Sequence, residues 1–425
     1  MGGAAGHMAH LSEDLDLTFR ELKDILGMVA KAEVEATEKV DGLNLFLTVD
    51  DMGEIKTARN SSDIRKGGMS TQDYAAKWAG HPAETAFMHG FEVIGQALDS
   101  LTPEDKRDIF ADGNRYLNME IMYFNPETGE DSNIINYGAS YVVLHGLNSN
   151  DPEAIEAFQR LVTALNESQI NVDAENWEVY GPAIIKLNNI SDSEAHKSLI
   201  RSLDALSAGL GGDNATISDL AKERYKSAVL AADFSPEQAE QLLDIVFKRI
   251  EDPSFRGTKE FNAFKKSLPT DRRPIASKYG TKTNAYKVIS IALRPLERII
   301  SDFAIEVLRN VKSAFVVDHD RAVQKLKDDL QTSIEKIRRL DTEGKFDMVR
   351  QLEKLGDPET NIASPLEGIV FKAPNGNIYK LTGSFAMVNQ IIGRAMRMRE
   401  PESSSESVVT ESILRKAIRK ILMSF

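Results

Sequence analysis

The chain has 425 residues and a mass of 47.1 kDa, with 42% hydrophobic and 28% charged residues. This composition is typical of a globular protein of two or three domains, and no apolar run approaches the roughly 20 residues that span a bilayer. The net charge of −13 excludes a protein coated with nucleic acid on every side, and the absence of cysteine excludes disulfides and thiolate chemistry. We therefore expect a cytoplasmic protein without membrane contact.

An amphipathic helix and a β-hairpin are predicted near the start of the chain. Leu17 to Ala32 has apolar residues at helical spacing. Leu43 to Val49 alternates in the manner of a half-buried strand, Asp50 to Gly53 has turn residues, and Glu54 to Arg59 forms the return strand. The first residues, Met1 to His10, have the composition of either a cloning remnant or a native start.

The hairpin groups three polar side chains into one candidate site. Lys39, Asp41 and Gly42 directly precede the first strand, and Arg59 ends the second. The turn would bring Arg59 back opposite Asn44, and directly opposed residues on paired strands lie about 5 Å apart. Lys39, Asp41 and Arg59 are therefore expected to be neighbours.

The next part of the chain alternates between predicted helices and strands. Glu120 lies in the middle of an aromatic and aliphatic strand, which makes it a second candidate site residue. The predicted elements are a loop at Ser61–Ser70, a helix at Ala75–Leu101, strands at Tyr116–Phe124 and Ile134–Leu147, and a turn at Asn125–Ser132.

A helical region is predicted from residue 151 to residue 357. It is interrupted by a strand-like piece at Trp177–Leu187 and a loop-rich piece at Pro253–Ser277. The predicted helices are Pro152–Gln169, Asp192–Leu210, Ile217–Ala231, Ser235–Arg249, Ala285–Phe315 and Asp318–Leu340.

Positive charge is concentrated in this helical region. Pro253 to Lys345 contains 20 Lys and Arg against 12 Asp and Glu. In Phe255 to Lys287 the ratio is 9 to 2, and aromatic residues are interspersed: Phe255, Phe261, Phe264, Tyr279 and Tyr286. Such a stretch suits phosphate neutralisation and base stacking. It equally suits a solvated helical face over core aromatics, so both interpretations remain open.

Strands are predicted again near the end of the chain. Glu367 to Lys372 and Asn377 to Leu381 flank Asn375-Gly376, a strong two-residue hairpin signal, and this pairing places Lys380 near Lys372. Further predictions are a short helix at Phe385–Arg397, an acidic, serine-rich linker at Pro401–Ser407, and a basic amphipathic helix at Thr410–Leu422.

Glu38-Lys39-Val40-Asp41-Gly42-Leu43-Asn44 resembles the acceptor motif of the covalent nucleotidyltransferases, the superfamily of ATP-dependent DNA ligases, RNA ligases and capping enzymes. Arg59, Glu120, the Glu367-Gly-Ile-Val sequence and Lys380 follow in the order of the later family motifs. The resemblance implies an α+β fold with a core of antiparallel sheets. This core would comprise residues 1–150 and 358–400, separated by the helical insertion and followed by a linker and helix at 401–425.

The resemblance implies ATP and Mg²⁺ as cofactors, with Lys39 as the nucleophile. An amine attacks only when deprotonated, so we expect burial and the cations Arg59 and Lys380 to lower the lysine pKa from about 10.4. Glu120 and Glu367 offer the oxygen ligands that Mg²⁺ prefers.

Other contacts to the nucleotide are implied by the family alone. Glu38 would contact the adenine amino group, Glu120 the ribose, and Lys380 the α-phosphate. Tyr141, or another side chain up to His145, would cover the base. Gly42 and Lys372 complete the candidate cofactor-binding set, although Lys372 faces away from Glu367 in an ideal strand.

The chain departs from the family pattern after Lys380, where the usual second lysine is missing. Only about 45 residues follow Lys380, too few for the oligonucleotide-binding barrel of DNA ligases and capping enzymes, which RNA ligases can lack. Asn44 after Asp-Gly also resembles RNA ligases. The prediction is thus a polynucleotide ligase that grips nucleic acid with its basic insertion. The alternatives are a GTP-using capping enzyme and a ligase-like structural protein without turnover.

The chain as a whole is also similar to proteins of large tailed phages. The shared features are the start, Gly2 to Met8, and the segment Tyr379 to Ala386. This resemblance implies that the N-terminus is native and that the protein works in the host cytoplasm or associates with the virion. The C-terminal helix would then dock on a capsid or another phage assembly, or else pack on its own domain.

Overall fold

The computed structural model describes most of the first 383 residues. The described ranges are 9–81, 83–125, 130–131, 137–147, 149, 151–166, 177–252, 254–309, 311–316, 319–339 and 366–383. The predicted helix at 385–397, the acidic linker and the C-terminal amphipathic helix therefore lie outside the described residues, as does the start up to Met8. Among the helices described, none combines the length and apolarity needed to cross a bilayer.

The first helix forms where the apolar periodicity predicts it. After the short strand β1 (Ala9–His10) and the 3₁₀ helix η1 (Leu11–Glu13), helix α1 spans Phe19–Ala30. Thr18 and Glu21 form a capping box that satisfies N–H groups at the start of the helix. The apolar face of α1 is fully buried, which positions the strand that follows.

A five-stranded sheet combines the two ends of the described chain. The strand order is β1-β13-β12-β2-β11, and all neighbours are antiparallel except β1 and β13. The predicted hairpin at Asn375-Gly376 is confirmed as β12 and β13. The strands are β2 (Ala36–Lys39), β11 (Ile184–Ile185), β12 (Gly368–Lys372) and β13 (Ile378–Thr382).

A six-stranded sheet contains the first predicted hairpin. Its order is β10-β9-β6-β3-β4-β5, antiparallel except for β10 beside β9, and the β3–β4 hairpin forms as predicted. A separate pair, β7 (Phe124–Asn125) and β8 (Glu130–Asp131), lies beside it. The six strands are β3 (Leu43–Val49), β4 (Ile55–Ala58), β5 (Met69–Ser70), β6 (Leu117–Met122), β9 (Ser140–Leu147) and β10 (Trp177–Tyr180).

Helices α3 to α6 pack with the six-stranded sheet around a hydrophobic core of its own. One helix was predicted over Ala75–Leu101, but the structure has two, because the chain turns at Gly80 with a positive φ of 75°. The predicted loop after Arg59 contains a short helix, α2 (Ser61–Ile64). The others are α3 (Thr71–Trp78), α4 (Glu84–Asp99), α5 (Pro103–Phe110) and α6 (Pro152–Asn166).

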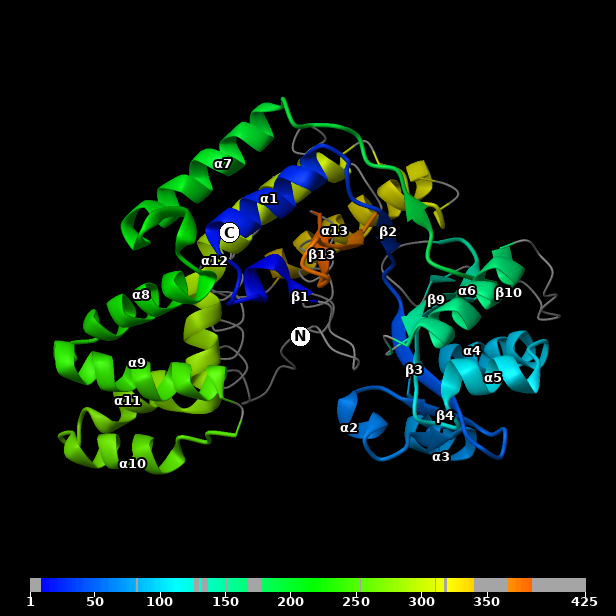
Figure 1. The fold of residues 1–425 in the computed structure, drawn as a ribbon, viewed down its shortest axis with the longest axis horizontal. Helices are drawn as coiled ribbons and strands as arrows, with labels where there is room; N and C mark the ends of the chain where they lie inside the picture. The colour runs from blue at the N-terminus through cyan, green and yellow to red at the C-terminus, as the bar shows by residue number, and fades with distance from the viewer. Residues whose placement is uncertain are drawn as a thin grey trace.

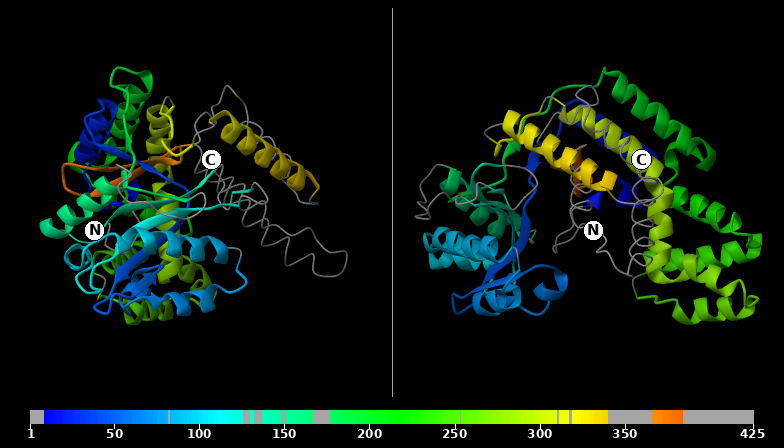
Figure 2. Two further views of the ribbon diagram at one scale, coloured as in Figure 1. Left: turned by 90° about the vertical axis from the view of Figure 1, so that its right-hand side faces the viewer. Right: turned by 180° about the vertical axis from the view of Figure 1, so that it is seen from behind.

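Helices α7 to α12, here called the helical block, share a second core with α1 and one face of the five-stranded sheet. The five-stranded sheet lies between this block and the six-stranded sheet (Figure 1), and α13 (His319–Arg339) extends away from both sheets (Figure 2). The block consists of α7 (Glu194–Ser207), η2 (Ala208–Leu210), η3 (Gly212–Asn214), α8 (Ile217–Leu230), α9 (Pro236–Glu251), α10 (Thr258–Ser267), α11 (Arg273–Gly280) and α12 (Lys282–Leu308).

Two predictions about the helical region need correction. The region was predicted to begin at residue 151, but α6 packs on the six-stranded sheet, and β10 and β11 add an edge strand to each sheet. The stretch Pro253–Ser277 was predicted to be rich in loops, but it contains α10 and α11. Phe261 and Phe264, three residues apart, anchor α10 in the core.

The fold is therefore a mixed α+β arrangement of antiparallel and mixed sheets with many helices. Within the residues described, neither sheet closes into a barrel. The chain passes from one core to the other between β2 and β3, and the candidate site residues Lys39, Asp41 and Gly42 lie at this passage.

Candidate active site

The chain crosses from one sheet to the other in only three residues. Strand β2 ends at Lys39 in the five-stranded sheet, and β3 begins at Leu43 in the six-stranded sheet. The crossing, Val40 to Gly42, lies tightly against β6. A Cβ at Gly42 would come within 2.8 Å of both Glu120 Cγ and the Ile121 carbonyl oxygen. Only glycine allows so close an approach, so this position is fixed by packing.

Lys39 is paired with Glu367, from a strand 328 residues away. In the register of β2 and β12, Lys39 lies opposite Gly368, and its Nζ forms an ion pair with the Glu367 carboxylate. Both side chains are largely buried, with 17% and 12% of their surfaces exposed. Nζ also lies 3.4 Å from the Val40 carbonyl oxygen. The structure thus brings the first and fourth predicted motifs into direct contact.

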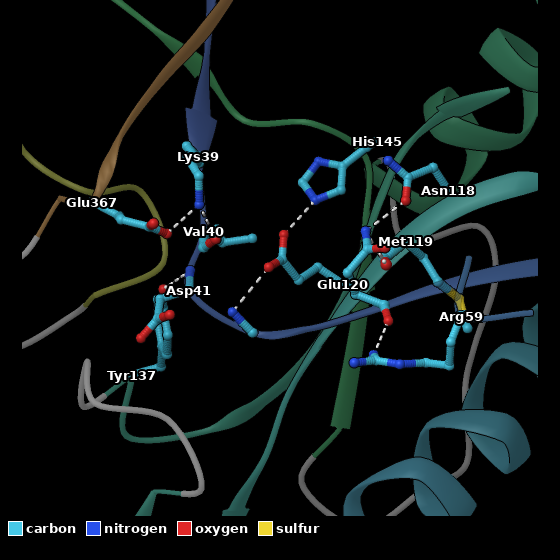
Figure 3. A network of polar contacts seen from close by, with 12 residues as sticks. Lys39, Val40, Asp41, Arg59, Asn118, Met119, Glu120, Tyr137, His145 and Glu367 are labelled. Atoms are coloured by element: carbon cyan, nitrogen blue, oxygen red, sulfur yellow. Dashed lines mark hydrogen bonds and ion pairs between the residues drawn. The ribbon is translucent and has the colours of Figure 1, made fainter. Parts of the chain in front are cut away.

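Glu120 is held by two hydrogen bonds beside the crossing (Figure 3). One carboxylate oxygen accepts the Gly42 N–H at 3.0 Å, and the other lies 2.9 Å from His145 Nε2. Burial opposes ionisation of Glu120, but the bond and charge of His145, together with Lys39 and Gly42, hold its pKa below the usual value. Glu120 is consequently an ionised acceptor in the site.

Asp41 contributes its backbone to a second contact. Its N–H donates to the Tyr137 hydroxyl at 2.7 Å, and Tyr137 is only 2% exposed. Burial raises the pKa of Tyr137 well above its usual value, with a further contribution from the Asp41 carboxylate. The hydroxyl therefore stays protonated and neutral.

Lys380 shares the Lys39 face of the five-stranded sheet. It pairs with Val370, which pairs with Thr37, and alternate residues of a strand lie on one face. Lys380 is only 6% exposed, and among the described residues its ammonium group forms no hydrogen bond or ion pair. Burial, followed by repulsion from Lys39, lowers its pKa. An anion entering the site would relieve both effects.

The expected lowering of the Lys39 pKa is wrong for this structure. Burial does favour the neutral amine, but the carboxylates of Glu367, Glu120 and Asp41 outweigh it and raise the pKa. Burial also raises the pKa of Glu367, to about 7, with repulsion from Asp41 and Glu120 adding to the effect although Lys39 opposes it. The site holds more carboxylates than ammonium groups, so a bound cation would stabilise it.

Arg59 returns to Asn44, as the hairpin predicts, but among the described residues it makes no contact with Lys39. Its Nη1 donates to the Asn44 carbonyl oxygen, two residues after Gly42. Its guanidinium lies over the ring of Phe87, 5.2 Å from the centroid, and over Trp78 at 5.9 Å. Within the described residues it forms no ion pair, so Arg59 is kept beside the site by its backbone contact and by cation–π packing.

Glu38 faces away from Lys39, because neighbouring residues of a strand point to opposite faces. Its carboxylate accepts hydrogen bonds from the Ser313 hydroxyl and, at 2.6 Å, from the Ala314 N–H. Burial raises its pKa to about 7 against these hydrogen bonds. The contact to adenine that the resemblance implies for Glu38 stays a prediction, and in this structure the carboxylate is engaged by the segment after α12.

Tyr141 belongs to a cluster of three rings next to that segment. Its centroid lies 5.7 Å from that of Phe315 and 5.9 Å from that of Tyr180, and the latter two are 5.7 Å apart. Phe315 closely follows Ser313, so one segment contacts both Glu38 and the aromatic cluster. The predicted covering of a base by Tyr141 stays untested.

Two further predicted contributions lie outside this cluster. Lys372 is exposed at the far end of β12, four residues beyond the partner of Lys39. In the basic stretch, Phe261 and Phe264 are each 6% exposed and belong to the core, so they are not stacking platforms, whereas Tyr286 is 46% exposed. The interpretation as a solvated face over core aromatics therefore holds for these two phenylalanines.

The described residues contain no group of three or more His, Asp or Glu side chains arranged to hold a metal ion. Mg²⁺, however, commonly uses one or two protein carboxylates and completes its octahedral shell with substrate phosphates and water. Glu120 and Glu367 both act on the charge of Lys39. The surplus of carboxylates fits a site of that open kind.

Tyr137, His145 and Ser313 are site residues that sequence reasoning missed or left unspecified. Tyr137 lies in an irregular segment, and Ser313 is 275 residues from Glu38, so neither has a local signal. His145 follows Tyr141 on the same strand by an even number of residues, a spacing that places both on one face. The chain matches no protein-family model, no curated protein and no solved structure.

Proposed function

We propose that this protein is an ATP-dependent polynucleotide ligase that works through a covalent Lys39–AMP intermediate, with RNA favoured over DNA. The proposal assigns the two sheets to a ligase-type nucleotidyltransferase core. It is supported by the ordered motifs of the sequence and by their meeting at one point, although they come from β2, β6, β12 and β13. The observation that carries it is the buried contact of Lys39 with Glu367, beside Lys380.

The first step transfers a nucleotide to the enzyme. Lys39 must first lose the proton that the surrounding carboxylates favour. Its neutral Nζ then attacks the α-phosphorus of ATP, an N–P bond forms, and the bond to the bridging oxygen breaks to release pyrophosphate. Glu367, in contact with Nζ and with a pKa of about 7, is placed to take the lysine proton. Lys380 would face the phosphate charge that develops.

In the later steps a nucleic acid replaces the lysine. The 5′-phosphate of one end attacks the lysyl-AMP phosphorus and regenerates the amine of Lys39. The 3′-hydroxyl of the other end then attacks the activated 5′-phosphate and releases AMP. Glu120 and Glu367 would hold Mg²⁺, which supplies neutralisation of phosphate charge when bound.

We assign nucleic-acid binding to the basic surface of the helical block, which is formed by exposed lysine and arginine side chains. Of its cationic side chains, Arg256, Lys259, Lys266, Lys278, Lys282 and Lys287 are exposed. Arg272 and Arg273 instead donate to backbone carbonyls and have structural roles. Exposed cations without a carboxylate partner suit a phosphate backbone and carry no sequence preference.

Self-labelling tests this proposal. Wild type incubated with α-labelled ATP and Mg²⁺ should retain label, whereas Lys39→Ala and Lys39→Arg should retain none, because a guanidinium keeps the charge but is not a nucleophile at neutral pH. Lys56→Ala is the matched control, since Lys56 also pairs with carboxylates but lies within the hairpin at β4.

Label from GTP alone would replace the ligase by the capping-type activity. No label from any nucleotide, on folded protein free of bound adenylate, would contradict both activities. That result would leave the alternative of a ligase-like phage structural protein, for which the C-terminal helix would be the docking element.

A further inference from the structure

The crossing after Lys39 is held from the side of the six-stranded sheet by two successive backbone contacts (Figure 3). The N–H of Asp41 donates to Tyr137, and the N–H of Gly42 donates to Glu120. Buried backbone N–H groups need partners, and losing one costs about 1 to 3 kcal/mol. The peptide groups that set the direction of Lys39 therefore cannot shift freely.

His145 extends this arrangement by one side chain. It comes from β9, the neighbour of β6, and holds the carboxylate oxygen of Glu120 that Gly42 does not use. The side chains of His145 and Glu120 are 11% and 13% exposed. Hydrogen bonds in such a low-dielectric setting are strong and reinforce one another. His145 thus fixes the orientation of the carboxylate that in turn fixes the crossing.

We propose that Tyr137 and His145 are positioning residues that clamp the crossing, so that the Lys39 amine is aligned for attack. This inference rests on the proposed function and adds two residues to it. Neither is expected to touch the nucleotide; Tyr137 acts through Asp41 N–H, and His145 acts through Glu120. A misplacement of about 1 Å at a reacting atom can lower a rate about 100-fold, so loosening the clamp should slow the covalent step.

The variants Tyr137→Phe and His145→Ala remove one side of the clamp each. We expect self-nucleotidylation at least about tenfold slower in each, with KM for ATP within about twofold of wild type. His145→Gln should recover most of the rate, because its amide can donate to Glu120. Recovery of the rate in His145→Gln would show that the hydrogen bond to Glu120, and not only the packing of the ring, is needed.

Matched controls lie in the helical block. Tyr225→Phe removes a buried hydroxyl that donates to the Tyr279 carbonyl at 3.1 Å, and His196→Ala removes a ring whose Nδ1 lies 2.8 Å from the Ser191 carbonyl oxygen. Both changes delete a similar contact far from Lys39 in the sequence and in the fold. They are expected to lower the melting temperature without slowing self-nucleotidylation.

Amide hydrogen exchange provides a readout that does not depend on activity. The peptide containing Asp41 and Gly42 should exchange faster in Tyr137→Phe and His145→Ala than in wild type or the two controls. Unchanged rates of both self-nucleotidylation and exchange in these variants would overturn the clamp. If the wild type takes up no label, the proposed function is overturned, and the catalytic role of the clamp with it. If the wild type is labelled and the variants are labelled at the same rate as the wild type, the clamp alone is overturned.

Discussion

The two faces of β2 differ sharply, although Glu38 and Lys39 are adjacent in the chain. On the Lys39 face, Lys39 and Lys380 are grouped with three carboxylates, those of Glu367, Asp41 and Glu120, so carboxylates outnumber lysines. On the other face, the Glu38 carboxylate accepts hydrogen bonds from the Ser313 hydroxyl and the Ala314 N–H. The pKa values of Glu38 and Glu367 are both about 7. A shifted pKa alone therefore does not distinguish a reactive face from an anchoring one.

The largest effect is expected from a substitution on the Lys39 face. Glu367→Gln removes the group that contacts the Lys39 amine, so self-nucleotidylation should fall by about 100-fold or more. The free energy of unfolding at pH 8 should stay equal or rise, since a neutral amide replaces a carboxylate whose ionisation is disfavoured by burial. Single-turnover labelling and urea unfolding measure the two quantities.

If Glu367→Gln is labelled at the wild-type rate, Glu367 has no role in self-nucleotidylation. A folded but inactive variant would match the expectation for a functional group, because such groups are commonly held at a cost in stability.

A second prediction separates the Lys39 face from the basic surface of the helical block. Reversing three exposed charges with Lys259→Glu, Lys266→Glu and Lys278→Glu should lower sealing of nicked nucleic acid by at least about tenfold at moderate salt. Self-nucleotidylation should remain within about twofold of wild type. A variant that reverses three exposed lysines elsewhere in the chain, Lys31→Glu, Lys66→Glu and Lys197→Glu, serves as the control with the same change in net charge.

If the variant loses sealing and self-labelling to the same extent, the basic surface is not a nucleic-acid-binding site separate from the Lys39 site. The salt dependence of sealing provides a sharper measure, since each lost phosphate contact should reduce the slope of log K against log salt by about 1.

The third prediction concerns the anchoring face. Ser313→Ala deletes the hydroxyl that donates to Glu38 and should lower the free energy of unfolding by about 1 to 3 kcal/mol, because a buried carboxylate loses a donor. The rate of self-nucleotidylation should change by less than about threefold. Urea unfolding and labelling kinetics test this. A large rate effect with normal stability would assign this face to the reaction instead.

The fourth prediction is a change in the pH dependence of stability. The pKa of Glu38 is raised in the folded state, so its protonation stabilises the fold at low pH, and this stabilisation is lost as the pH rises from about 4.5 to about 7. The change amounts to a few kcal/mol at most, about 1.4 per pKa unit. In Glu38→Gln this slope should be reduced, and the contribution of Glu367 should remain.

Unfolding midpoints in urea at pH 5 and pH 8 measure this slope. An identical slope in wild type and Glu38→Gln would mean that Glu38 is ionised throughout this range, and the anchoring face would then be held by a charged carboxylate.

Local patterns predicted the two hairpins well. Alternation in Leu43–Val49 and the Asn375-Gly376 turn depend on neighbouring residues, and the structure forms both strand pairs. Each register differs by one residue from the prediction, because Ala58 pairs with Phe46 and Lys380 pairs with Val370. The contact of Lys39 with Glu367 joins residues 328 positions apart. Only the order of motifs, through the resemblance, suggested that they meet.

Other features had no local signal. The Ser313 bond to Glu38 and the Tyr137 bond to Asp41 depend on how irregular segments fold back over the crossing. Helices α10 and α11 span only 10 and 8 residues, and glycines and prolines such as Gly257, Pro269 and Gly280 flank or end them, so the stretch predicts loops. The pKa of Lys39 is raised because the carboxylates of Glu367, Glu120 and Asp41 lie close to it in the fold. The order of these residues in the chain does not reveal this proximity.

The most direct test of the central claim is peptide mapping by mass spectrometry after incubation with ATP and Mg²⁺. We expect one added AMP, located on Lys39, and its removal when pyrophosphate is added, because the first step is reversible. An unmodified Lys39 on folded protein that began free of adenylate, or AMP attached at another residue, would contradict it.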